Sequence, residues 1–371
     1  MNKLLLAAAG SGKTTFILEE ALSYPTCEEI MITTYTQSNF NSIISKLYEM
    51  NGCIPPNITI QTWFSFLIEH GIKPYQYWEG RISGMLLVSK RSGFRYFNKR
   101  GKPVYWGEKN LYKYYFTDGG NPNELIVYSD KLSQLAMACN SHSCGSVIWR
   151  MSKIWKKFYI DEVQDMTGYD LDVVRELLIS GISTTLVGDP RQVVYQTHPS
   201  HKYEKYKGNI RKFIEDECKP GICEIDDHTL NTSYRNPFEI CQLSGELYPE
   251  YATPLPYSKQ IDINHPVLFL PETRVQEYLS EHPSVQLRYN IKTKVNDSYP
   301  VFSFGDSKGQ EFDSVVIYPT KEMLKWLVNH EVKLEPQTRA RLYVALTRTR
   351  KDLAIIIPES FIKQLSYGKF Y

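Results

Sequence analysis

The residues best suited to chemistry lie near the start of the chain, where Ala7–Thr14 reads Ala-Ala-Ala-Gly-Ser-Gly-Lys-Thr. A glycine loop between a strand and a helix directs successive backbone N–H groups at a phosphate, and the start of the helix adds its positive dipole end. We expect Lys13 to reach the β- and γ-phosphates and Thr14 to bind Mg²⁺. Ala7 stands where this pattern normally begins with glycine. The predicted nucleotide contacts are Ala9, Gly10, Ser11, Gly12, Lys13, Thr14 and Thr15.

A pair of acidic residues gives the second chemical signal. Asp161 and Glu162 follow the apolar run Phe158–Ile160, so we expect them at the carboxyl edge of a sheet, where ligands bind in open α/β folds. Asp161 is predicted to coordinate Mg²⁺, and Glu162 is predicted to orient and deprotonate an attacking water. An Asp-Glu pair after a strand is often only structural, but together with the phosphate loop it indicates catalysis.

The third signal is Leu186–Gln192, a strand end followed by a turn. Gln192 carries a neutral amide that can contact a γ-phosphate and lose that contact on hydrolysis, so we expect it to act as a sensor. Gly188, Asp189 and Pro190 by themselves predict only a turn.

These residues require strands and helices to position them. Strands alternate with helices in both halves of the chain, which indicates parallel sheets and an α/β fold. Residues 198–228 are polar and charged, and we expect a surface hairpin or linker there. The predicted strands are Leu4–Ala8, Ile30–Thr34, Phe158–Ile160, Thr184–Val187, Val267–Leu270, Val315–Tyr318 and Leu353–Ile357, and the predicted helices include Phe16–Leu22, Asn41–Met50 and Leu171–Leu178.

The 371 residues are enough for two or three domains. The α/β alternation stops at about residue 72 and resumes at about residue 145, which indicates an inserted subdomain. We therefore predict two α/β domains, the first of them interrupted. The predicted parts are 1–71 and 145–228 for the first domain, 72–144 for the insertion and 229–371 for the second domain.

The predicted insertion has a distinctive composition. Residues 81–113 contain nine Lys and Arg residues against one acid, Glu108, with six aromatic residues between them. Cations that follow phosphates beside rings that stack on bases are typical of a nucleic-acid surface. The alternative is a small solvated subdomain whose aromatic residues form its core.

The overall composition excludes several classes of protein. The net charge of +2 excludes a polycation, so nucleic acid must be bound by local patches. No apolar run approaches the length of a membrane span, and Leu4–Ala9 is shorter than the apolar part of a signal peptide. The seven cysteines contain no Cys-x-x-Cys pair and are predicted to be reduced thiols. We expect a cytoplasmic protein, or one of the host cytoplasm if a phage encodes it, without a membrane partner.

Taken together, the motifs resemble those of superfamily 1 helicases, specifically the UvrD/Rep-like group. The Asp-Glu-Val-Gln-Asp form of residues 161–165 points to that group. The matches follow the family order from residue 7 to residue 350. The further matching segments are Ile32–Gln37, Thr62–Phe66, Ser233–Asn236, Ser307–Asp313 and Tyr343–Arg348.

The resemblance implies two RecA-like P-loop domains with ATP in the cleft between them. Arg235 and Arg348 are then expected to reach the γ-phosphate, since a guanidinium keeps its charge and can brace two phosphate oxygens. Glu311 is expected to accept a hydrogen bond from the ribose, and Gly309 to allow close approach of the backbone. The family motif that reads adenine upstream of the phosphate loop is expected to be absent.

For nucleic acid, the resemblance implies contacts to a single strand, with Tyr35 and Tyr195 stacking on bases. Such stacking contributes about 1–3 kcal/mol per base and tolerates any sequence. Phe64, Thr197 and Gly305 depart from the residues that the family usually has, so unwinding is less firmly predicted than ATP hydrolysis. The predicted nucleic-acid contacts are Tyr35, Gln37, Thr62, Trp63, Tyr195 and Ser303.

The leading hypothesis is an ATP- and Mg²⁺-dependent 3′–5′ translocase or helicase on single-stranded or tailed DNA, hence a nucleic-acid-stimulated ATPase. One alternative is an ATP-gated clamp or regulatory subunit that serves a nuclease or another repair, replication or defence protein. Another is an RNA helicase of viral type, because Gly188-Asp189-Pro190-x-Gln192 also occurs there. The pair Gln164-Asp165 argues against this last alternative.

Overall fold

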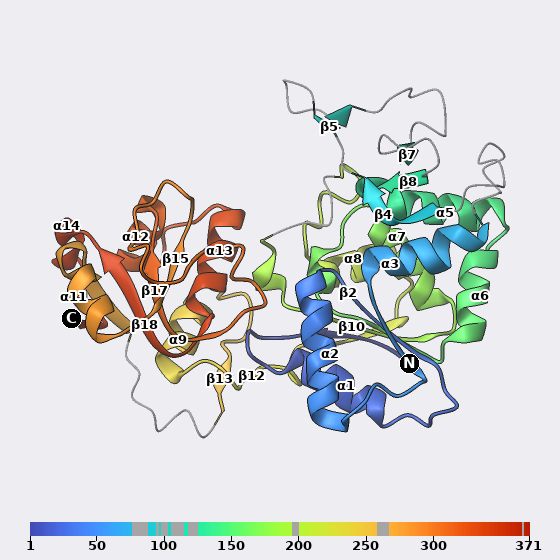
Figure 1. The fold of residues 1–371 in the computed structure, drawn as a ribbon, viewed down its shortest axis with the longest axis horizontal. Coiled ribbons are helices and arrows are strands. Elements are labelled where there is room, and N and C mark those ends of the chain that lie inside the picture. The colour runs from blue at the N-terminus through green and yellow to red at the C-terminus, as the bar shows by residue number, and fades with distance from the viewer. Residues whose placement is uncertain are drawn as a thin grey trace. The chain divides into compact units, whose positions relative to one another are not determined.

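The structure is a computed structural model of the chain (Figure 1). By their contacts, the residues form two compact units: Met1–Leu5, Thr14–Gly188 and Gln196–Asp226 make the first, and Leu6–Lys13, Asp189–Tyr195 and Asp227–Tyr371 make the second. The residues that the structure describes are 1–75, 88–93, 96–97, 103–104, 115–117, 125–194, 200–257, 267–365 and 367–371.

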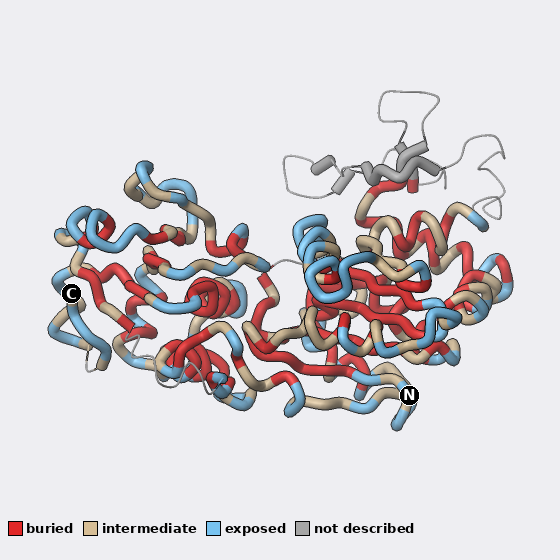
Figure 2. Tube along the Cα trace, turned by 60° about the horizontal axis from the view of Figure 1, so that its bottom comes forward, coloured by how far each residue is buried: buried red, intermediate tan, exposed pale blue. Residues whose placement is uncertain are grey.

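The first unit is built on a six-stranded sheet whose pairings β1–β11, β9–β10, β2–β9 and β2–β3 are parallel. The central strands β2 and β9 are buried along their length, as strands of a two-sided parallel sheet must be (Figure 2). In sheet order the strands are β11 (Cys223–Asp226), β1 (Asn2–Leu6), β10 (Ser183–Gly188), β9 (Lys157–Ile160), β2 (Ile30–Thr34) and β3 (Ile58–Thr62).

Helices connect these strands and cover the sheet (Figure 1). Side-chain caps define their starts: Thr36 accepts from the N–H of Asn39 before α2, and Thr62 does so from Ser65 before α3. Gly52 then ends α2 in the left-handed conformation. The helices are α1 (Lys13–Leu22), α2 (Gln37–Asn51), α3 (Trp63–Phe66), α5 (Leu132–His142), α6 (Ser146–Ile154), α7 (Tyr169–Ile179) and α8 (Ile210–Glu217).

The prediction of a surface hairpin or linker over residues 198–228 is wrong for its second half. This stretch contains α8 and the edge strand β11, and Ile210, Phe213 and Ile214 of α8 are buried. The apolar residues are few but recur at helical spacing, and the many charged residues between them concealed that pattern.

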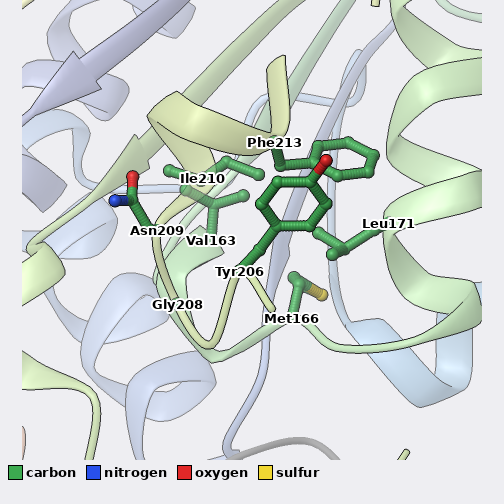
Figure 3. A pocket seen from close by; sticks show the side chains of 8 residues that line it. All are labelled: Val163, Met166, Leu171, Tyr206, Gly208, Asn209, Ile210 and Phe213. Carbon is green, nitrogen blue, oxygen red and sulfur yellow. The ribbon is translucent and has the colours of Figure 1, made fainter. Parts of the chain in front are cut away.

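Part of α8 closes a small apolar pocket beside the acid motif (Figure 3). The volume of this pocket is about 10 Å³, which is hardly enough for one water molecule. The pocket is therefore too small to hold a nucleotide. The lining residues are Val163, Met166, Leu171, Tyr206, Gly208, Asn209, Ile210 and Phe213.

Short strands occur in the segment predicted to be an insertion. β4 (Val88–Gly93) pairs in parallel with β8 (Leu125–Tyr128), which pairs in antiparallel fashion with β7 (Phe116–Thr117). β5 (Tyr96–Phe97) pairs with β6 (Pro103–Val104). The basic and aromatic residues of 81–113 lie outside the described residues or in strands whose backbone alone is described. Their role in binding nucleic acid stays a prediction.

The second unit has a six-stranded sheet of its own, and all of its pairings are parallel. A short parallel pair, β12 (Thr232–Ser233) with β13 (Leu255–Pro256), precedes it. In sheet order the strands are β16 (Val301–Ser303), β15 (Val285–Arg288), β17 (Phe312–Tyr318), β18 (Thr349–Ile357), β14 (Val267–Pro271) and β19 (Lys369–Phe370).

Alternate residues of these strands enter two different cores. In β18, Leu353, Ile355 and Ile357 belong to the larger core, whereas Ala354 and Ile356 belong to the smaller one. This period of two means that both faces of the sheet are covered. Helices α9 (Phe238–Glu246), α12 (Lys321–Val328) and α13 (Pro336–Leu346) supply the larger core, α11 (Val275–Glu281) supplies the smaller core, and α14 (Glu359–Ile362) follows β18.

The prediction of an α/β fold with parallel sheets is confirmed. The identification of the units as RecA-like domains, and the boundaries at residues 71, 144 and 228, stay predictions. None of the helices in the described part of the chain has the length and apolar character that crossing a membrane requires.

A buried carboxylate ties three parts of the first unit together. Asp170, at the start of α7, accepts a hydrogen bond from the indole N–H of Trp63 (2.8 Å) and a short one from the hydroxyl of Ser133. It is fully buried. A buried donor that loses its acceptor destabilises the fold by its unrecovered desolvation free energy. The Asp170 carboxylate therefore stabilises the packing of α3 and α5 against α7.

We therefore expect Asp170→Ala to destabilise the first unit by about 2–4 kcal/mol, since two buried donors lose a charged acceptor. Urea-induced unfolding, followed by tryptophan fluorescence, measures the effect. Asp216→Ala, at an exposed position of α8, serves as the control and should change the midpoint little. Equal midpoints for the two variants would contradict this role of Asp170.

Candidate nucleotide-binding site

The phosphate loop leaves β1 and contains two glycines in the left-handed backbone region. Gly10 has φ of +72° and Gly12 has φ of +79°, a conformation that side chains disfavour. Gly10 also has no room for a side chain, because a Cβ there would lie 2.6 Å from the Cβ of Arg235 and 2.8 Å from the Oγ of Ser233. The Gly-x-Gly pattern is thus required by the backbone.

The carbonyl groups of this loop are hydrogen-bonded to other segments of the second unit. A guanidinium N–H of Arg191 donates to the Ala7 carbonyl (2.9 Å), and the Ser233 hydroxyl donates to the Ala9 carbonyl (3.0 Å). The backbone N–H of Tyr234 donates to the Gly10 carbonyl (2.8 Å). The N–H groups of Ala8, Ala9 and Ser11 donate to the Leu230 carbonyl (2.8 Å), the Tyr343 hydroxyl (3.4 Å) and the Ala8 carbonyl (3.2 Å). With its carbonyls and these N–H groups paired, the loop can direct the N–H groups of its remaining residues at an anion.

One side chain of the loop also suits a phosphate. The Ser11 side chain is buried, and its hydroxyl has no partner within the described part of the chain. A buried hydroxyl without a partner is costly in a protein, and a phosphate oxygen would satisfy it. The left-handed glycines and this hydroxyl therefore fit the phosphates of a nucleotide.

Asp189 positions the predicted sensor. Its side chain is completely buried, and it accepts a hydrogen bond from the Gln192 amide (2.8 Å). The carbonyl oxygen of the same amide accepts from the guanidinium of Arg348 (3.3 Å). Both ends of the Gln192 amide are therefore fixed. The structure brings together Gln192 and Arg348, two of the residues that the sequence analysis placed at the γ-phosphate.

Arg348 follows α13 and is only 1% exposed. Besides Gln192, its guanidinium donates to the Val344 carbonyl (3.0 Å) and to the Gln310 carbonyl (3.1 Å). A buried guanidinium must have such acceptors, since burying an unpaired charge is prohibitive. Arg348 can reach a phosphate only by exchanging some of these partners.

Arg235 belongs to a surface ion pair. Its Nε donates to Glu311 (2.9 Å), and its guanidinium also donates to the Thr347 carbonyl (3.3 Å). Arg350 makes a second, short contact to the same carboxylate. Burial raises the pKa of Glu311, but the hydrogen bond from Arg350 and the charge of Arg235 outweigh it and hold that pKa below its ordinary value.

Two further predicted residues lie at the end of β16 and in the loop that follows it. Gly309 has φ of +83°, which suits glycine. The Ser303 hydroxyl donates to the Asp306 carboxylate (2.7 Å) and accepts from the Asp306 N–H (3.1 Å), forming a local turn.

The acid pair lies in the first unit, directly after β9. Asp161 and Glu162 are both buried. Glu162 has φ of +56°, a strained conformation of the kind that occurs at functional sites and costs about 1–3 kcal/mol. Its N–H donates to the Asp161 carboxylate (2.9 Å), and Gln164 makes a short hydrogen bond to its side chain. These contacts hold the two carboxylates in fixed orientations.

Gly188 makes room for that arrangement. A Cβ on Gly188 would lie 2.4 Å from the side-chain oxygen of Gln164. The glycine that ends β10 therefore allows Gln164 to lie beside the neighbouring strand end and hold Glu162.

The residues predicted to bind Mg²⁺ fit that ion by their chemistry. Asp161 offers a carboxylate and Thr14 a hydroxyl, and Mg²⁺ in phosphate-loop proteins takes only one or two protein ligands, with water and phosphate oxygens completing its shell. The described residues contain no cluster of three or more acids, histidines or cysteines that could hold a metal alone.

The residues predicted to contact nucleic acid differ in exposure. Tyr35 is half-buried and packs edge-on against Phe64 (5.5 Å between ring centroids), and Gln37 is exposed at the start of α2. Thr62 caps α3. Trp63, in contrast, is fully buried with its N–H bonded to Asp170, so its ring supports the core. Tyr195 and Thr197 lie outside the described residues.

Comparison with known protein families gives the identity of the chain. The family model of the viral superfamily 1 RNA helicase core domain matches residues 120–357, well over half of the chain. The chain belongs to this family. The match begins after the phosphate loop, so the role of that loop rests on its own sequence and geometry.

Membership in superfamily 1 confirms the coarser part of the resemblance. The family implies an NTP-hydrolysing nucleic-acid helicase. The matching family is of the viral type. The pair Gln164-Asp165 therefore does not argue against a viral-type core. Gln164 instead has a structural task beside Glu162.

Among solved structures, the helicase core is similar to arterivirus nonstructural protein 10, a helicase whose structure was determined in complex with DNA. The identity is 14% and the TM-score is 0.47, and the similarity covers 99% of this chain. The chain spans 63% of the length of that protein. The search of curated proteins found no match to this chain.

Two residues of the candidate nucleotide-binding site were not anticipated from the sequence. Arg191 and Tyr343 lie within recognised motifs but had no assigned role, and both contact the phosphate loop. No spacing rule reveals such contacts, because they join segments that are distant in the chain. A buried Arg beside an Asp in a turn was the available signal for Arg191.

The ion pair of Glu311 predicts that the stability of the second unit depends on pH. A carboxyl whose pKa is lowered by folding stabilises the fold above its ordinary pKa of 4.5, and this stabilisation disappears as the pH falls through the lowered value. Because the pair is partly exposed, we expect Glu311→Gln to cost less than about 1 kcal/mol at pH 7. Thermal unfolding from pH 7 to pH 3 measures the difference from wild type, which should become smaller toward the acid end.

Glu331→Gln, at an exposed position of the same unit, is the control and should behave as wild type throughout. A difference between wild type and Glu311→Gln that grows as the pH falls would contradict the ion pair.

Proposed function

We propose that the chain is an ATP- and Mg²⁺-dependent motor of UvrD/Rep-like character that moves 3′–5′ along single-stranded DNA and separates tailed duplexes. The observation that carries the proposal is the hydrogen bond between Gln192 and Arg348 (3.3 Å) in the unit that also contains the phosphate loop. A sensor amide joined to a buried guanidinium can report the presence or loss of a γ-phosphate.

In this proposal, the N–H groups of the loop and the Lys13 ammonium hold the phosphates of ATP. Arg235 and Arg348 contact the γ-phosphate and stabilise negative charge as it redistributes in the transition state. Glu311 releases Arg235 in exchange for the ribose, for which its carboxylate is a suitable acceptor. Gly309 allows the backbone to approach the nucleotide.

The acid pair supplies the hydrolytic chemistry. Thr14 and Asp161 hold Mg²⁺, which neutralises charge on the phosphates when bound. Glu162 accepts a proton from the attacking water, and its fixed orientation beside Gln164 directs its carboxylate at that water.

Conversion of hydrolysis into movement requires two arrangements of the sensor. In one, Arg348 donates to Gln192, Val344 and Gln310, as described above. In the other, it donates to the γ-phosphate, and Gln192 turns to the same group. Since ATP binds only the second arrangement tightly, each hydrolysis event returns the site to the first arrangement.

We propose that the strand is contacted by Tyr35, Gln37 and Thr62 of the first unit and by Ser303 of the second. Tyr195 and the basic, aromatic segment 81–113 are proposed to add stacking and phosphate contacts. Trp63 acts indirectly, by supporting the turn that carries Thr62.

An RNA substrate is the second candidate. The specific observation in its favour is the description of the matching family model as an RNA helicase core. The residues proposed to contact the strand are compatible with either nucleic acid, because stacking and phosphate contacts do not distinguish DNA from RNA. The substrate must therefore be determined by experiment.

Lys13→Ala is expected to lower nucleic-acid-stimulated ATP turnover by about 100-fold or more, because it removes a charge that stabilises the transition state. Phosphate release measured with and without oligonucleotide tests this expectation. Lys3→Ala changes an exposed lysine of β1, the strand before the loop, and should retain the wild-type rate. Unchanged turnover in Lys13→Ala would refute the assignment of the phosphate loop.

Duplexes with a 3′ tail, a 5′ tail or blunt ends, made of DNA and of RNA, test polarity and substrate together. We expect ATP-dependent strand separation on 3′-tailed DNA, and none with Glu162→Gln, which lacks the proposed base. Separation of RNA alone would establish the second candidate. ATP turnover without separation of any duplex would leave an ATP-gated clamp or nuclease subunit as the function.

A further inference from the structure

Arg191 is a buried cation that the proposed hydrolysis does not use. It precedes the sensor Gln192 and is only 4% exposed. Its side chain donates a hydrogen bond to a carbonyl of the phosphate loop, that of Ala7. Burial of this cation requires hydrogen-bond partners, because removing a charge from water costs several kcal/mol unless partners replace the water.

All three nitrogens of the Arg191 guanidinium donate hydrogen bonds. Its Nε donates to Asp189 (2.8 Å), and one terminal nitrogen donates to the Ala7 carbonyl (2.9 Å). The other terminal nitrogen donates to the Ala252 carbonyl (3.4 Å). The planar guanidinium therefore connects the turn after β10, the first residue of the phosphate loop and the segment before β13.

Aromatic rings fix the plane of that guanidinium. Its central carbon lies 5.3 Å from the ring centroid of Tyr343 and 5.7 Å from that of Tyr251, within the range of a cation–π contact. The hydroxyl of Tyr343 accepts a hydrogen bond from the Ala9 N–H (3.4 Å). Arg191 and Tyr343 thus contact each other and hold Ala7 and Ala9, two residues of one loop.

Asp189 links this arrangement to the sensor. One of its carboxylate oxygens accepts from Arg191, and the other accepts from the Gln192 amide. A single buried carboxylate therefore orients both the residue that holds the loop and the residue that senses the γ-phosphate. Burial lowers the pKa of Arg191, but the Asp189 charge more than offsets it, so the guanidinium stays charged at every pH at which the protein folds.

We propose that Arg191 is a positioning residue for ATP: together with Tyr343 it holds the phosphate loop in its phosphate-binding shape. This inference rests on the proposed function and adds a residue to its site. Lysine cannot replace arginine here, because one ammonium cannot donate to Asp189 and to Ala7 in the geometry of a planar fork.

The test measures binding of a fluorescent ATP analogue to the full chain carrying Glu162→Gln, so that hydrolysis does not interfere. We expect Arg191→Lys to weaken binding about tenfold, equivalent to about 1.4 kcal/mol. In the chain with Glu162 intact, the KM for ATP should rise by a similar factor while kcat at saturating ATP changes less than threefold. Affinity for single-stranded DNA without nucleotide should not change. Tyr343→Phe, which loses one long hydrogen bond, should weaken ATP binding about threefold.

Arg339→Lys is the matched control. Arg339 also donates to a backbone carbonyl, pairs with Glu250 and lies over the ring of Tyr248, but it does not contact the phosphate loop in the described structure. It should retain wild-type ATP affinity. Arg191→Met is the second variant: it fills the same space without charge, and it should bind ATP as weakly as Arg191→Lys or more weakly.

The outcomes separate this inference from the proposed function. Absence of ATP binding in the wild-type chain would overturn both. Wild-type ATP binding that Arg191→Lys leaves unchanged would overturn the inference alone. Equal losses of ATP and DNA affinity, accompanied by a lower unfolding temperature, would also overturn it, because Arg191 would then only support the core.

Discussion

A loop that offers its N–H groups to a phosphate must find other partners for its carbonyl groups, and this constraint governs the second unit. The carbonyls of Ala7, Ala9 and Gly10 all have donors from segments that lie far away in the chain. Arg191 donates to the Ala7 carbonyl and Ser233 to the Ala9 carbonyl. The shape of the loop is therefore a property of the whole unit, and its glycines are necessary for that shape but not sufficient.

Hydrogen bonds between buried side chains connect the sequence motifs to one another. Asp189 holds Gln192, and Gln192 accepts from Arg348. Each of these side chains is buried, so a change at one of them alters the hydrogen bonds available to the next. Such a chain of contacts allows loss of a single phosphate group to alter the conformation of residues that never touch the nucleotide.

The sequence was sufficient for the parts of the molecule that local rules determine. Apolar runs predicted strands such as Ile30–Thr34 correctly, and the Gly-x-Gly pattern predicted the turn between β1 and α1, because these features depend on neighbours in the chain. Residues 210–217 were missed as a helix because charged residues outnumber the few apolar ones. The buried position of Trp63 and the contact of Arg191 with Ala7 depend on tertiary packing, which one sequence does not encode in a readable pattern.

The central claim is that ATP at the phosphate loop exchanges the partners of Arg348. The most direct measurement is an experimental structure of the chain with Mg²⁺ and a non-hydrolysable ATP analogue. The account predicts phosphates within hydrogen-bonding distance of Lys13 and the Gly10–Thr14 backbone, with the Arg348 guanidinium turned from Val344 and Gln310 to the γ-phosphate. A bound analogue with Arg348 still hydrogen-bonded to Gln192 and those carbonyls would contradict it.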